Sequence, residues 1–177
     1  MIAKILHQLW RFVFLVGIQV ILLNHIQWSG YVNPYIYIFF ILMLPVETPK
    51  WLLLVLALCT GLVIDMFGTS GGIHAAATVF MAFVRPGILK LIAPRDGYDT
   101  DTKLTPGVMG FNWFITYISI MVLLHHLAYF YIEVFRFSEF FMTFLKAIIN
   151  SVITVALIVV GQYLFGRQAK RNERIIG

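Results

Sequence analysis

The sequence is poor in charged residues and contains a single cysteine. Lys, Arg, Asp and Glu make up 12% of its 177 residues, about half of what a soluble domain carries. Hydrophobic residues make up 60%, and the mean hydropathy is +0.88. Cys59 lies inside an apolar run, so no disulfide framework and no cysteine metal site is expected. These shortages exclude an ordinary soluble domain and indicate that lipid covers much of the surface.

Apolar stretches of nearly the length needed to cross a bilayer follow one another along the chain. The predicted fold is an all-α integral membrane protein, a bundle of about six transmembrane helices. It forms one domain over residues 1–177. The second stretch is short and almost purely aliphatic and aromatic, so it could face lipid, and the fourth should be broken or kinked at Pro86. The expected spans are residues 9–28, 33–46, 51–67, 72–93, 111–132 and 141–165.

The basic residues predict the orientation of these spans. With the N-terminus in the cytoplasm, the thirteen Lys and Arg residues fall on the inner side except for Arg136 and Lys146. This asymmetry is typical of cytoplasmic loops and places both termini in the cytoplasm. It predicts a polar cytoplasmic loop at residues 94–107, either a solvated connector or a docking loop, and a basic cytoplasmic tail at residues 166–177. The basic residues are scattered between apolar segments, so nucleic acid is not an expected partner.

Polar and small residues at helical spacing indicate which helix faces pack against each other, because helices in lipid associate through such residues. On the third span the small residues Ala57, Gly61 and Gly68 share a face with Asp65, and Gly72 lies in the glycine-rich turn that follows. The stripe on the fifth span consists of Asn112, Thr116, Ser119, His126 and Glu133, and that on the sixth of Thr143, Lys146, Asn150, Thr154 and Gly161.

Four ionisable residues form the candidate site. A charged side chain within a span is expensive and is by default a functional hypothesis. At 1.5 Å per residue, Asp65 and Lys146 lie roughly 8 Å below the outer boundary, with His126 at a similar level. His74 follows the glycine turn directly. We therefore predict an outer-leaflet polar cluster in which Asp65 pairs with Lys146 and His74 or His126 lies alongside.

The cluster has three possible roles: a structural polar core or partner site, a ligand cavity that opens outward, or an acid–base site. No zinc-protease motif, phosphate-binding loop or nucleophile elbow is recognised, so no enzyme is expected. His125 and His126 are adjacent and project about 100° apart on a helix, so they are poorly placed to share a metal. No cofactor and no metal is predicted.

Two short motifs resemble a known family. Gly61-Leu62-Val63-Ile64-Asp65 precedes a glycine turn, and Gly72-Ile73-His74-Ala75 opens the next helix. This combination resembles the bacterial rod shape-determining protein MreD family, in its Bacteroidetes-type form. The residues at the shared positions are Gly61, Asp65, Gly72 and His74. The specific part covers only residues 45–86, and the flanking helices match in length and hydropathy alone.

The resemblance implies a non-enzymatic scaffold of the cell-elongation machinery, which regulates rod shape and lateral peptidoglycan synthesis in the bacterial inner membrane. The implied partners are an MreC-like protein, an MreB-like cytoskeleton, a glycosyltransferase and a transpeptidase. A partner's single transmembrane helix would dock on a small-residue face near Gly61, Gly68 and Ala75. The family fold is similar to the substrate-binding subunit of energy-coupling-factor transporters, so a small-molecule (vitamin-like) binding subunit is the alternative.

Overall fold

The computed structural model describes residues 2–25, 32–68, 70–99, 102–135 and 139–165, and these residues form helices and connections without a β-strand. Within these described ranges, four helices are apolar and long enough to cross a membrane. The prediction of a helical membrane-embedded protein is therefore confirmed, whereas a count of six spans is not. The four helices are α3 (Lys50–Phe67), α4 (Ile73–Leu91), α6 (Phe111–Val134) and α7 (Phe140–Phe165).

A fifth apolar helix and four short helical segments complete the described chain. Helix α1 (Ile2–Ile21) has a shorter apolar stretch than the other four, from Leu6 to Ile21. The short segments are η1 (Leu23–His25), η2 (Ile36–Ile38), α2 (Phe39–Leu42) and α5 (Pro106–Met109). The predicted basic tail at residues 166–177 and residues 100–101 of the predicted loop lie outside the described residues.

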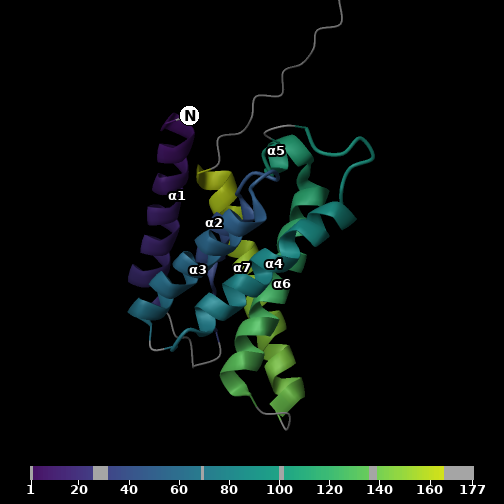
Figure 1. Cartoon of the computed structure of the whole chain (residues 1–177). Coiled ribbons are helices and arrows are strands. Elements are labelled where there is room, and N and C mark those ends of the chain that lie inside the picture. Colours follow the sequence, from purple (N-terminus) through teal and green to yellow (C-terminus); the bar gives the residue numbers. More distant parts are fainter. Residues whose placement is uncertain (1, 26–31, 69, 100–101, 136–138, 166–177) are drawn as a thin grey trace, which may run out of the picture.

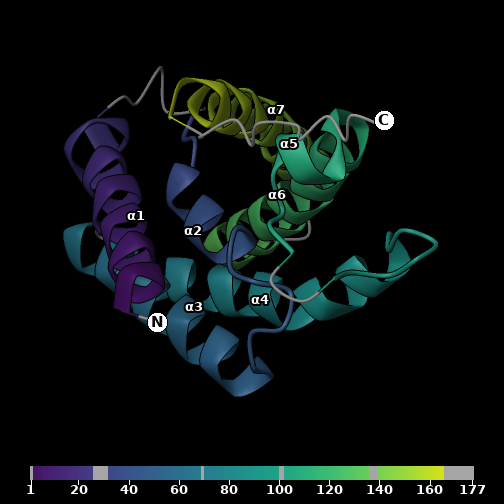
Figure 2. The same ribbon diagram turned by 90° about the horizontal axis from the view of Figure 1, so that it is seen from above.

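The long helices surround a short central segment. Seen from above, α1, α3, α4, α6 and α7 are arranged around η2 and α2 (Figure 2). The start of α1 and the end of α7 lie at the same end of the molecule, and the α6–α7 hairpin projects beyond the other helices at the opposite end (Figure 1). The chain thus encloses its own residues 33–44 in the middle of the bundle.

This central segment corrects the expectation for residues 33–46. Every residue from Tyr35 to Leu44 is buried, so the segment belongs to the core and does not face lipid. Its helical part, η2 and α2, is only about 10 Å long at 1.5 Å per residue. Hydropathy could not distinguish the two environments, because an aliphatic and aromatic run is as common in a protein interior as on a surface that faces lipid.

Side chains of α1 and α7 bind the backbone at the beginning of the central segment. Irregular backbone at membrane depth requires such partners, because lipid offers no hydrogen bonds. The Gln19 side chain accepts the N–H of Ile36 at 2.8 Å and donates to the carbonyl of Pro34 at 3.1 Å. Two α7 side chains accept the neighbouring N–H groups, Asn150 that of Asn33 (2.5 Å) and Thr154 that of Tyr35 (3.2 Å).

A buried arginine binds the carbonyls at the end of the central segment. Arg85 Nη2 donates to the carbonyl of Leu42 at 3.4 Å and to that of Leu44, and Nε donates to the Tyr117 hydroxyl at 2.9 Å. That hydroxyl donates in turn to the Leu42 carbonyl at 3.0 Å. Arg85 is 1% exposed, so this charge, which we expected in a cytoplasmic piece of the chain, is buried inside the bundle.

Two further expectations about the helices differ from the structure. Helix α4 continues from Ile73 to Leu91 with Pro86 inside it, so of the break or kink expected at residues 85–87 the break is absent. On α6, Asn112 and Thr116 are exposed although His126 is buried. The exposed pair lies in the first two turns of α6, next to the polar connection, where side chains reach water without crossing lipid. On α7, Thr143 and Asn150 are buried as the stripe predicts.

Candidate functional site

Asp65 connects the end of α3 to the beginning of α4. Its carboxylate accepts the backbone N–H groups of His74 (3.1 Å) and Ala75 (2.9 Å) and the hydroxyl of Ser70 (2.5 Å). The first N–H groups of a helix have no partner within the helix and favour a negative charge. Asp65 therefore caps α4 from outside, across the glycine turn.

Two glycines allow this corner to close. A Cβ atom at Gly61 would lie 2.4 Å from the Cα of Ala75 and 2.8 Å from the carbonyl oxygen of His74. Only a residue without a side chain permits this contact between α3 and α4. Gly72 has φ +98°, in the left-handed region that favours glycine. The four motif residues Gly61, Asp65, Gly72 and His74 thus form one α3–α4 corner.

A tyrosine of the central segment links this corner to α6. The Tyr37 hydroxyl lies 3.1 Å from His74 Nδ1, 3.0 Å from Thr78 Oγ1 and 3.0 Å from His125 Nε2. Thr78 Oγ1 also donates to the His74 carbonyl at 2.6 Å. Because the Thr78 hydroxyl proton is used in this bond, Thr78 Oγ1 accepts the hydroxyl proton of Tyr37. The Tyr37 oxygen has two lone pairs, so it accepts one N–H from each of the two imidazoles. We name these four side chains the Tyr37 cluster.

The same reasoning fixes the hydrogen bonds of the two adjacent histidines. In the Tyr37 cluster, a neutral His125 carries its proton on Nε2, so its Nδ1 is unprotonated. This buried Nδ1 atom has no hydrogen-bond partner within the described chain. His126 Nδ1 lies 2.9 Å from the Val122 carbonyl, an acceptor, so Nδ1 holds the proton there. Its Nε2 then accepts from Thr154 Oγ1 at 3.3 Å. Both rings are thus oriented as members of the packed interior.

Tyr35 lies between His74 and His126 and connects these two predicted site residues. Its ring centroid is 4.7 Å from that of His74 in an edge-on arrangement and 5.3 Å from that of His126 in a stacked one. Tyr129 lies against the same ring at 4.7 Å. The structure therefore brings His74 and His126 into one aromatic environment, but through Tyr35 and not by direct contact.

Lys146 does not pair with Asp65, which corrects the expected ion pair. Its Nζ lies 3.3 Å from Glu133 Oε2 and 4.6 Å from the ring centroid of Phe130. The estimate from helix rise gave the depth of each residue in the membrane but not which helices are neighbours. Lys146 lies on α7, which packs against α6, whereas the Asp65 carboxylate faces α4. The Lys146 and Glu133 side chains are 23% and 35% exposed, so the pair contributes less than about 1 kcal/mol.

Contrary to our expectation from the sequence, residues 68–72 contain the letters G-x-S-x-G of a nucleophile elbow. That motif needs a strand-to-helix turn and a histidine that accepts the serine proton. Here Ser70 precedes helix α4 and donates its proton to Asp65, while His74 turns its ring toward Tyr37. The serine is therefore part of the helix cap, and its geometry does not match a nucleophile.

The described residues contain no group of three or more His, Cys, Asp or Glu side chains that could hold a metal ion. The arrangement is that of a hydrogen-bonded interior that holds α3, α4, α6 and the central segment together. No family model, no curated protein and no solved structure matches this chain.

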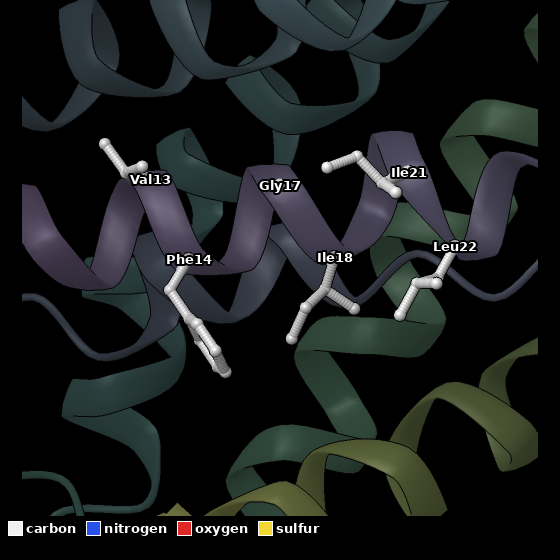
Figure 3. Close-up of a pocket in the computed structure, with 6 residues that line it drawn as sticks. All are labelled: Val13, Phe14, Gly17, Ile18, Ile21 and Leu22. Atoms are coloured by element: carbon white, nitrogen blue, oxygen red, sulfur yellow. The ribbon is translucent and has the colours of Figure 1, made fainter.

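One apolar groove lies on the outside of α1 (Figure 3). Val13 and Ile21 extend to one side of the helix, Phe14 and Ile18 to the other, and Gly17 lies between them. A Cβ atom at Gly17 would meet nothing within 4 Å. The groove has a volume of about 280 Å³ and is open toward the surroundings of the helix.

Removing the Asp65 carboxylate should destabilise the protein. Asp65→Ala leaves two N–H groups of α4 without a partner and should lower the free energy of unfolding by about 1–2 kcal/mol. Asp65→Asn retains an acceptor oxygen and should cost less. Thermal unfolding in mild detergent measures both variants against Asp96→Asn, an exposed loop carboxylate. Equal melting temperatures for Asp65→Ala and the control would contradict the capping role.

Proposed function

We propose that this protein is a non-enzymatic scaffold of the bacterial cell-elongation machinery, as the resemblance to MreD implies. It would lie in the inner membrane with both termini in the cytoplasm and support rod shape and lateral peptidoglycan synthesis. The observation that carries this proposal is the filled centre of the bundle. Residues Tyr35 to Leu44 are buried there, and side chains of the surrounding helices bind the backbone at both ends of the segment.

The filled centre argues against the alternative, a vitamin-like binding subunit of a transporter. A small-molecule site is a concave pocket that encloses most of its ligand. In the described part of this chain, the protein's own segment takes the central position, and the Tyr37 cluster binds Tyr37 in the way a site would bind a ligand hydroxyl. The alternative would require this segment to move out of the bundle.

The motif residues support the family resemblance as a structural unit. Gly61 permits the close contact of α3 with α4, and Asp65 caps α4. Neither residue is left over for chemistry. Gly61 and Ala75 are buried against one another, so the small-residue face we expected to hold a partner helix is already occupied within the chain.

The α1 groove offers a partner's single transmembrane helix an open, small-residue surface. Small residues allow helices to approach closely in lipid, where no hydrophobic force drives them together. Gly17 provides an open position between two rows of branched and aromatic side chains (Figure 3). We therefore place the MreC-like partner's helix against α1 in this proposal.

Photo-crosslinking in cells that contain the elongation machinery tests the proposal. A crosslinker at Val13 or Ile21, which flank Gly17, should capture a single-span elongation protein. A crosslinker at Met66, which is 80% exposed on α3, serves as the matched control and should capture lipid. Lipid alone at all three positions, together with no elongation protein after affinity purification, would overturn the scaffold. A small molecule retained through purification would support the transporter subunit instead.

A further inference from the structure

Two guanidinium groups bind the carbonyls at the end of the central segment. Arg85 of α4 donates to the carbonyls of Leu42 and Leu44, and Arg11 of α1 donates to the carbonyl between them, that of Met43, at 3.4 Å. Two positively charged side chains from different helices thus bind successive carbonyls of one short stretch of backbone. The negative end of the helix dipole compensates them only in part.

No carboxylate within the described chain pairs with either arginine. A charge taken out of water without a partner of opposite sign is strongly unfavourable. Arg85 is almost completely buried, so an anion from outside the protein cannot contact its side chain directly. Arg11 is only partly buried, so any compensating anion must approach from the side of α1.

Arg11 has unused hydrogen-bonding capacity. Its contacts are long, with Nη1 3.3 Å from Gln8 Oε1 and Nη2 3.2 Å from His7 Nε2. A guanidinium offers five N–H donors in a planar fork that fits a phosphate. The residues beside it face outward, since Leu9 is 56% and Trp10 is 68% exposed. Tryptophan is typical of the level at which lipid headgroups lie.

We propose that Arg11, with the charge of Arg85 behind it, binds the phosphate of an anionic phospholipid. Basic pockets between transmembrane helices are suited to such headgroups. The bound phosphate would neutralise the arginine pair and thereby stabilise the end of the central segment. This site is independent of the scaffold function and depends only on the protein being embedded in a membrane.

Lipid retention measured by native mass spectrometry tests the site. The protein is purified from a mixture of phosphatidylglycerol and phosphatidylcholine, and the ratio of the two retained lipids is measured. Arg11→Gln should lower the enrichment of phosphatidylglycerol roughly fivefold, the effect of one basic residue at a membrane surface. Arg11→Lys should retain part of it. Lys90→Gln, an equal charge change at an exposed position of α4, should leave the enrichment unchanged.

Two further measurements separate a bound lipid from free phosphate and from a folding defect. Phosphatidylglycerol should raise the melting temperature of the wild-type protein above its value in phosphatidylcholine, because a ligand of the folded state stabilises it. Lys90→Gln should show the same rise in melting temperature with phosphatidylglycerol. This comparison of lipids uses no Arg11 variant, so it remains valid even if Arg11→Gln does not fold. An excess of inorganic phosphate should not displace the lipid, and displacement would overturn the lipid as the source of the phosphate. Equal enrichment for Arg11→Gln and Lys90→Gln would overturn the site.

Discussion

Replacing Gly61 with alanine should prevent the α3–α4 corner from closing. The new Cβ atom would lie 2.4 Å from the Cα and 2.7 Å from the backbone nitrogen of Ala75, and backbone atoms cannot move aside as the end of a flexible side chain can. Forcing an extra methyl group into packed protein costs about 1–3 kcal/mol and more where the backbone must shift. Since the same shift pulls α4 away from Asp65, we expect about 3 kcal/mol or more.

Gly161→Ala on α7 is the matched control, because a Cβ atom there meets nothing within 4 Å. An interior helical glycine replaced by alanine gains about 0.5–1 kcal/mol from the lower entropy of the unfolded chain. Size-exclusion profiles and melting temperatures in detergent should therefore change in opposite directions for the two variants. If Gly61→Ala behaves like Gly161→Ala, the close contact of α3 with α4 is incorrect.

Replacing Arg85 with methionine should be the second most damaging change. Methionine fills a similar volume but removes the donor to the Leu44 carbonyl and to the Tyr117 hydroxyl, and leaves the Leu42 carbonyl with Tyr117 as its donor. Hydrogen bonds from a charged group are each worth about 1.5–3 kcal/mol, and removal of a buried charge offsets part of their loss, so a net loss of about 3 kcal/mol is expected. Arg85→Lys keeps the charge without the planar fork and should fall between methionine and the wild type.

Arg95→Gln provides the control for Arg85→Met, because Arg95 is exposed in the connection after α4. It should unfold at the wild-type temperature. Limited proteolysis adds a second readout, since a released central segment should be cleaved near Pro45 in Arg85→Met but not in the control. A methionine variant as stable as the wild type would mean that Arg85 does not hold the end of α2.

Hydropathy predicted the long helices well because lipid demands a continuous apolar stretch of fixed length. It could not predict whether residues 33–46 face lipid or the core, since both environments select the same side chains. The tyrosine hydroxyls of that segment were the available signal, because a buried tyrosine usually needs a polar partner. Tyr37 finds such partners in two histidines and a threonine of α4 and α6.

The candidate site was predictable in part. The order of Gly61, Asp65, Gly72 and His74 along the chain identified the α3–α4 corner, because the residues of a helix–turn–helix lie close together whatever the rest of the fold. The partner of Lys146 was not predictable, since residues at one depth on different helices meet only if those helices are neighbours. The burial of Arg85 was not predictable, because counting basic residues on each side of the membrane does not distinguish an exposed charge from a buried one.

The helices at the two edges of the bundle differ in length. Helix α3 has 18 residues and α7 has 26, a difference of about 12 Å at 1.5 Å per residue. A bilayer adapts to such mismatch by local thinning or thickening, at a cost for every ångström. Tilting of α7, or a bilayer that is thinner beside α3 than beside α7, would accommodate this difference, so the lipid beside the two helices need not have one thickness.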